Sequence, residues 1–193
     1  MNAEELLKRY AAGERDFRLV NLKGAKLSRV NLSEADFSEA DFSEADLTSI
    51  RLKRSNLRRT IFRAAKLDFA DLSHAMLDEA DLSNISLEVN LERASLERAN
   101  LSNSYLTGSS LAYTNLRNAN LQNANFFEAS LKGANLEGAD LRNAIMGETC
   151  LYEANLRGSL VEGCDLSDSY RRNTIMPDGQ VVTDKYAEMP SDD

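Results

Sequence analysis

The sequence has few of the residues that catalysis, metal binding and membrane insertion require. Its 193 residues include two cysteines, two prolines, one histidine and no tryptophan. No apolar run approaches the ~20 residues of a membrane-spanning helix. The start of the chain, Met1 to Gly13, is polar and lacks the apolar centre of a secretory signal. We therefore expect a cytoplasmic protein without a membrane partner.

The same scarcity argues against an enzyme. His74 is the single histidine, and no serine stands at a useful spacing from a base. Glycines occur singly, so no phosphate-binding loop is indicated. Cys150 and Cys164 have neither CxxC spacing nor a nearby histidine, which favours two reduced thiols over metal ligands. We expect no catalytic residue, no cofactor and no metal site.

A five-residue period dominates the rest of the chain. Leucine or phenylalanine occupies every fifth position from Phe17 to Leu166, with Met146 and Val161 as the only other residues there. We call this the central position; the residue two before it is nearly always small, most often alanine, with Ile50 and Ile85 as exceptions. A period of five matches neither a helix, at 3.6, nor a flat strand, at 2. It indicates a repeat architecture.

The period can be read as a short strand followed by a corner. The small and central residues point inward with one residue between them, and the outer residues turn the chain. In many repeats the residue two positions after the central one is glycine or asparagine. These corner residues are Gly24, Gly108, Gly133, Gly138, Gly158, Gly163, Asn84, Asn103, Asn118, Asn123 and Asn143. Type II turns need positive φ there. We expect type II corners mainly after Tyr105, and a different turn where Glu, Arg or Tyr fills the position.

This pattern resembles the pentapeptide-repeat family, in which four pentapeptides form one coil of a right-handed quadrilateral β-helix. The resemblance implies an all-β solenoid over residues 15–169, with 20 residues per coil, so that Phe17 lies under Phe37 and Phe42 under Phe62. The segments Arg9–Gly13 and Ile175–Gly179 also resemble cyanobacterial members, including a regulator of heterocyst differentiation. One step, from Leu87 to Leu91, is four residues long. Because Val89 and Leu91 keep their inward spacing, we expect a tightened corner there.

Both ends of such a tube need caps over their apolar rungs. Residues 1–14 predict a capping helix from about Ala3 to Ala12, with Asn2 as N-cap and Gly13 as its end. Leu6, Leu7 and Tyr10 are expected to face the first coil. Residues 170–193 predict a C-terminal cap, in which the turn signal within residues 175–182 folds back over the last rung. The tail from Met189 is expected to be loose.

Charges alternate in blocks along the chain, which carries a net charge of −8. Residues 34–46 are acidic, 51–66 basic and 68–81 acidic. A 20-residue coil would stack these blocks and pair Glu34–Arg54, Glu39–Arg59, Asp46–Lys66, Arg51–Asp71, Arg58–Asp78 and Arg59–Glu79. Surface ion pairs of this kind contribute about 0–1 kcal/mol each. We favour this interpretation over a basic girdle for nucleic acid, because the neighbouring blocks neutralise it.

Outward apolar side chains are the best indication of a site. Tyr105, Phe127 and Ile145 are expected on one side of the tube, with Tyr113 and Tyr152 on the next. They predict either a protein-contact surface or rings that cover the corners of adjacent coils. Our leading hypothesis is a non-enzymatic, possibly regulatory scaffold that binds an unidentified protein, as a monomer or an end-to-end dimer.

The alternative is a DNA mimic that binds a topoisomerase such as gyrase, as the resemblance allows. The basic block at 51–66 and the modest net charge weigh against it. Ice binding would need aligned outward threonines, which the sequence lacks.

Overall fold

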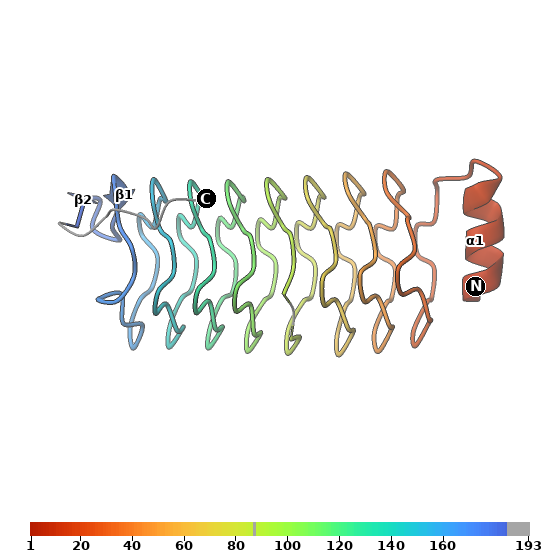
Figure 1. Ribbon diagram of the computed structural model, residues 1–193, viewed down its shortest axis with the longest axis horizontal. Coiled ribbons are helices and arrows are strands. Elements are labelled where there is room, and N and C mark those ends of the chain that lie inside the picture. Colours follow the sequence, from red (N-terminus) through yellow and green to blue (C-terminus); the bar gives the residue numbers. More distant parts are fainter. Residues whose placement is uncertain (87, 185–193) are drawn as a thin grey trace, which may run out of the picture.

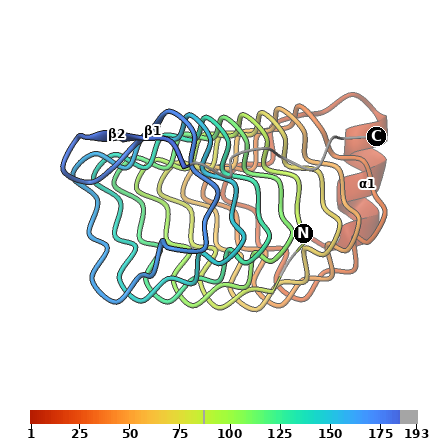
Figure 2. The ribbon, with the colours of Figure 1, turned by 60° about the vertical axis from the view of Figure 1, so that its left-hand side comes forward.

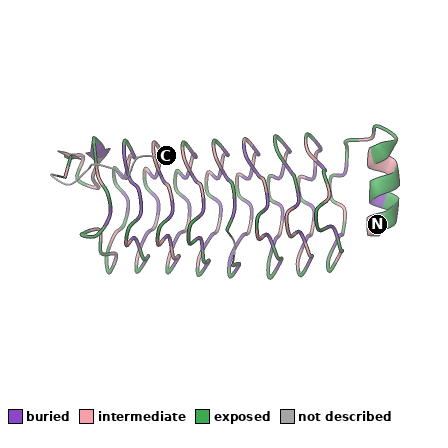
Figure 3. Cartoon of the chain, in the orientation of Figure 1, coloured by how far each residue is buried: buried purple, intermediate pink, exposed green. Residues whose placement is uncertain are grey.

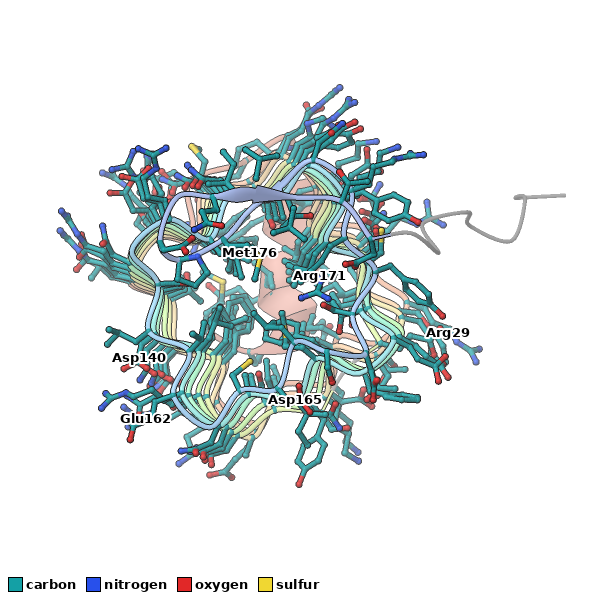
Figure 4. All side chains as sticks on the ribbon, turned by 90° about the vertical axis from the view of Figure 1, so that its left-hand side faces the viewer. Arg29, Asp140, Glu162, Asp165, Arg171 and Met176 are labelled. Atoms are coloured by element: carbon teal, nitrogen blue, oxygen red, sulfur yellow. The ribbon has the colours of Figure 1, made fainter. Side chains whose placement is uncertain are left out.

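The computed structural model describes residues 1–86 and 88–184 and shows an elongated tube of stacked coils (Figure 1). Parallel backbone bridges join residues 20 positions apart, as between Asp16, Asp36 and Asn56. Four such bridging segments and four turns complete each coil, and the end-on view in Figure 4 shows the resulting square outline. The predicted four-sided coil of 20 residues is therefore present.

The coil is right-handed. Figure 4 looks from the C-terminal end, and Asp140, Asp165, Arg171 and Met176 follow one another anticlockwise around the tube. The chain approaches the viewer as it passes through them in this order, which defines a right-handed path. We number the walls by their first central residue: wall 1 from Phe17, wall 2 from Leu22, wall 3 from Leu27 and wall 4 from Leu32.

The inside of the tube is a column of central side chains. Phe17 stacks on Phe37 with ring centroids 5.3 Å apart, and Phe42 on Phe62 at 5.5 Å, as the 20-residue coil predicts. Apart from Leu166 near the C-terminal end, which is partly buried, the described leucines at central positions within the coils are almost completely buried. Each contributes about 1.5–3 kcal/mol by leaving water. Figure 3 shows buried and exposed residues alternating along every coil, and Figure 2 shows the coils stacked in register.

Hydroxyl residues fill several of the small inward positions, and most of those that are buried hydrogen-bond to the backbone, whereas the buried Ser159 hydroxyl has no hydrogen-bond partner among the described residues. Thr60 donates to the carbonyl of Phe37 at 3.0 Å, and Thr149 to that of Phe126 at 2.7 Å. Each of these bonds crosses from one coil to the coil before it. The small position therefore accepts serine or threonine where the backbone of the neighbouring coil offers an acceptor.

The corners are more uniform than their sequences predict. Positive φ occurs at Gly24 (66°), and equally at Glu34 (61°), Arg59 (57°) and Tyr113 (59°). The turn closes with a bond from the small residue to the preceding central carbonyl, as from Ala40 to Phe37 at 3.0 Å. The expectation of a second turn type at Glu, Arg and Tyr corners is therefore wrong, as is the concentration of positive φ after Tyr105. Stacking on the coils above and below imposes one conformation on all of them.

Asp and Asn side chains immediately before the central residue stabilise the corners by accepting hydrogen bonds from the backbone two residues later. Asp41 accepts a bond from the backbone N–H of Ser43 at 2.8 Å, and Asn120 accepts one from Gln122 at 3.2 Å. The Ser43 hydroxyl is the main cause that lowers the pKa of Asp41 below its ordinary value. Similarly, hydrogen bonds from Arg18 lower the pKa of Asp16 to about 2. These carboxylates therefore stay ionised and act as local turn braces.

The four-residue step is absorbed at one corner between walls 3 and 4. Val89 and Leu91 are both buried, as predicted, while Leu87 lies outside the described residues. After the step the bridges join residues 20 apart again, and across it they join residues 19 apart, as Asp71 with Asn90. The missing residue therefore shortens a corner and leaves the walls aligned.

The N-terminal end is covered by helix α1, Ala3–Ala11, which lies across the tube (Figure 1). Asn2 caps it by accepting a bond from the Glu5 N–H at 2.8 Å. Leu6 is fully buried, and the Tyr10 hydroxyl donates to the Ser33 carbonyl at 2.9 Å. Leu7 is 36% exposed, so its predicted contact with the first coil is wrong. It lies one residue beyond Leu6 on a helix, where adjacent residues point about 100° apart.

The C-terminal end carries a hairpin of β1, Thr174–Ile175, and β2, Val181–Val182. Ile175 bridges Asn155 in the last full coil and pairs antiparallel with Val181, so β2 covers that edge of wall 1 as predicted. On wall 4, Arg171 takes a central position and pairs with Asp184 at 2.9 Å. The expected loose tail from Met189 lies outside the described residues.

Candidate protein-binding surface

The basic block at 51–66 does not form a free cationic surface. Arg58 pairs with Asp78 at 3.1 Å, and Arg59 lies 2.9 Å from Glu79 and 3.9 Å from Glu39. Arg54 lies 3.8 Å from Glu34. These four pairs confirm the predicted stacking of opposite charges.

The other two expected pairs, Asp46–Lys66 and Arg51–Asp71, lie side by side in adjacent coils because their backbones form β-bridges. Asp46 bridges Lys66, and Arg51 bridges Asp71, without a close side-chain ion pair between these described residues. The hydroxyl of Thr48 is the main cause that lowers the pKa of Asp46, and the charge of Lys66 adds to it. An open hollow of about 440 Å³ beside Arg58 and Arg59 is lined by charges of both signs. Neutralisation leaves little potential there for a polyanion.

Wall 3 carries exposed apolar side chains where the sequence predicts them. Tyr105, Asn125 and Ile145 bridge one another on successive coils, and Tyr105 is 61% exposed and Ile145 53% exposed. Phe127 lies on the same wall, on the coil between them, and is half-buried. We call Tyr105, Phe127 and Ile145 the wall 3 patch.

The ring of Phe127 rests on the next coil. A Cβ atom placed at Gly147 would lie 3.3 Å from this ring, so glycine there makes room for it. Phe127 therefore covers the coil that follows and also presents one side of its ring to solvent. The sequence predicts either a protein-contact surface or rings that cover adjacent coils, and Phe127 fits both descriptions.

Tyr113 and Tyr152 on wall 4 differ from the wall 3 patch. The Tyr113 ring lies over Gly133, where a Cβ would come within 2.5 Å of it, and Arg93 lies 5.6 Å from its centroid on the coil before. Tyr113 thus covers a corner while remaining 45% exposed. Tyr152 is only 1% exposed, and the Arg172 guanidinium lies 4.5 Å from its ring. Its expected place on an outer contact surface is wrong, because the following coil covers it.

Two exposed aromatic residues, Phe69 and Tyr170, were not predicted from the sequence, and Tyr170 is the less exposed at 38%. Phe69 is 65% exposed at the corner between walls 3 and 4, beside the four-residue step. A hollow of about 380 Å³ lies there between Phe69, Val89 and Gly108. The corner position of Phe69 in the five-residue pattern was the available signal, since most residues there are polar or glycine.

The described residues hold no cluster of metal-ligating side chains. Across residues 1–86 and 88–184, no group of three or more His, Cys, Asp or Glu side chains is placed to hold a metal ion. Both cysteines are free thiols, and burial raises the pKa of Cys164 to about 11. None of the helices in this part of the chain has the length and apolar character to cross a bilayer.

Stacked four-sided coils with an elaborated outer surface define a β-solenoid repeat protein. The family model for pentapeptide repeats matches residues 16–54, 45–84, 88–123 and 119–158. The chain therefore belongs to the pentapeptide-repeat family.

Several solved structures are similar to it. HetL, a pentapeptide repeat protein involved in heterocyst differentiation regulation from the cyanobacterium Nostoc sp. strain PCC 7120, is 30% identical over 94% of this chain and 100% of that chain, with a TM-score of 0.36. Rfr23 from the cyanobacterium Cyanothece 51142 is 26% identical over 86% and 97%, with a TM-score of 0.28. Full-length QnrB1, a plasmid-mediated fluoroquinolone resistance protein, is 17% identical over 78% and 90%, with a TM-score of 0.30. A comparison with curated proteins finds no match. None of these likenesses assigns a partner to this chain.

Proposed function

We propose that this protein is a non-enzymatic scaffold that binds a partner protein through wall 3. The observation that carries the proposal is the wall 3 patch, in which exposed Tyr105 and Ile145 flank the partly exposed ring of Phe127 on successive coils. An apolar group on an otherwise polar wall is typical of a contact surface. Tyrosine and phenylalanine are also enriched at protein interfaces.

The rigid coil supports this role. Backbone bonds link each wall to the next coil, as from Leu106 to Asn125 at 2.7 Å and from Phe126 to Ile145 at 2.8 Å. The patch is thus held on a surface that loses little conformational entropy when a partner binds. We place this activity in the cytoplasm, a setting that suits two free cysteines.

The DNA-mimic alternative receives less support. A duplex mimic needs a continuous acidic surface, whereas Arg58 and Arg59 interrupt the acidic coils and pair with them. No feature of the described residues favours a topoisomerase over another protein partner.

Partner capture followed by reconstitution tests the proposal. The wild-type chain and the double variant Tyr105→Ser, Ile145→Ser are used as baits in lysate of the source cell, and a protein recovered specifically is then purified and titrated against each. The control variant Leu19→Ser, Val181→Ser removes two apolar residues that lie away from wall 3 and are somewhat more exposed (71% and 64%) than Tyr105 and Ile145. We expect the patch variant to bind the purified partner at least tenfold more weakly than the wild type does, and the control variant to bind it with wild-type affinity. Equal binding of both variants would exclude wall 3.

A further inference from the structure

The wall 3 patch admits side-chain contacts but not an added strand. The backbone N–H groups of Leu106 and Phe126 already donate to the next coil. A partner therefore cannot extend this wall by β-augmentation, the mode that an open sheet edge would permit. It has to bring its own folded element to the patch.

The spacing of the patch matches an α-helix lying along the tube. Tyr105, Phe127 and Ile145 occupy three successive coils, and adjacent coils are about 4.8 Å apart as paired strands are. An α-helix advances about 5.4 Å per turn. A helix parallel to the tube axis therefore places one apolar side chain per turn against each coil of the patch, in the groove-binding mode of amphipathic helices.

The patch is bordered by carboxylates that lack an ion-pair partner. Glu128, Glu148, Asp165 and Asp168 are all exposed on wall 3 and its corner with wall 4. None of them lies within ion-pairing distance of a basic group in the described chain, in contrast to the paired acids of the first coils. The nearby Arg142 is engaged by Asp140 at 2.6 Å.

A hollow joins these carboxylates to the patch. It has a volume of about 270 Å³, and its lining includes Ile145, Gly147, Gly163, Asp165 and Asp168. Two glycines keep it open, while its rim combines an apolar side chain with two carboxylates. This combination suits a lysine or arginine side chain, whose methylene stem packs on apolar surface while its charged end meets an anion.

We propose that the partner element on wall 3 is a basic amphipathic α-helix that lies along the tube axis. Its apolar side chains contact Tyr105, Phe127 and Ile145, and one of its lysine or arginine side chains enters the hollow at Asp165 and Asp168. The inference rests on the proposed function and names the chemistry of its partner.

Titration with synthetic peptides tests this assignment on the intact chain. Three peptides of equal length are compared: an amphipathic helix of leucine and lysine, the same sequence with glutamate for lysine, and a scrambled leucine–lysine sequence with no apolar face. We expect the basic amphipathic peptide to shift amide resonances on wall 3 in residues 105–108, 125–128, 145–148 and 163–168. The glutamate peptide is expected to bind at least tenfold more weakly, and the affinity of the basic peptide to fall as salt rises.

A charge-matched pair of variants separates a specific site from general attraction. Asp165→Asn, Asp168→Asn removes two charges at the hollow, and the control Glu153→Gln, Asp178→Asn removes two exposed charges elsewhere. The first double variant is expected to bind the basic peptide at least fivefold more weakly, and the second to bind it with unchanged affinity. Equal weakening in both, equal binding of the scrambled peptide, or shifts confined to another wall would overturn the helix assignment. A purified partner that depends on Tyr105 and Ile145 but presents no basic helix would overturn it as well, while leaving the proposed function intact.

Discussion

At most corners, the residue two positions after the central residue adopts nearly the same backbone conformation whatever its side chain. Ser49 has a φ of 56° and Glu79 one of 60°, values close to the 66° of Gly24. Residues with a Cβ atom disfavour this left-handed region, at a cost of roughly 1 kcal/mol. The many non-glycine corners therefore carry a small strain that the stacked coils outweigh.

Glycine at such a corner is expected to stabilise the protein. Ser49→Gly relieves the left-handed strain and should raise the free energy of unfolding by about 0.5–1 kcal/mol. Ser28→Gly is the matched control, because Ser28 stands one position earlier in its turn and lacks positive φ. It should lower stability by up to about 1 kcal/mol. Urea denaturation of both variants measures the difference, and a loss of stability in Ser49→Gly would contradict the strain argument.

Single residues also show what could be predicted from the sequence. The stacking of Phe17 on Phe37 could be predicted, because apolar residues at this strict spacing can all be buried only on the inside of the coil. The turn at Glu34 was not predicted, since its own preference is overruled by the coils on either side. Tyr152 was placed outside for a similar reason: its burial depends on Arg172, twenty residues later.

Helix α1 acts as an end cap through one strongly buried side chain. Leu6 is completely buried, whereas its neighbour Leu7 is 36% exposed. The sequence predicted the helix, its N-cap and its end, but not which of the two leucines packs. That choice depends on how the helix is rotated against the first coil, and both residues are equally apolar.

Truncation of these two leucines should have unequal effects. Leu6→Ala is expected to lower the free energy of unfolding by about 2–4 kcal/mol, because it leaves a cavity under the helix. Leu7→Ala should change it by no more than about 1 kcal/mol. Hydrogen exchange at residues 17–37 should quicken in the first variant alone. Similar losses in both would mean that the helix packs through a wider surface.

At the scale of the whole molecule, the four-residue step shows how errors in spacing are absorbed. The bridges across the step keep walls 1, 2 and 4 continuous, although one coil is a residue short. The sequence predicted this outcome because Val89 and Leu91 keep their two-residue spacing. It could not predict the hollow beside Phe69, which depends on how the shortened corner stacks against Gly108.

A residue returned to this corner should be tolerated. Insertion of serine between Glu88 and Val89 restores the five-residue period and is expected to change the free energy of unfolding by no more than about 1 kcal/mol. Insertion of serine between Asn120 and Leu121 is the control. It separates an inward pair and should cost about 2–5 kcal/mol, because one core side chain is turned outward. Equal costs, measured by urea denaturation, would show that corners and walls are equally constrained.

The square coil also determines how the molecule can change length. An inserted block of 20 residues would move everything beyond it by one coil, about 4.8 Å, without rotation. A block of five would instead turn everything beyond it by a quarter of a revolution. Two surfaces on the same wall can therefore be spaced apart in whole coils, whereas a single extra pentapeptide would send them to different sides of the tube.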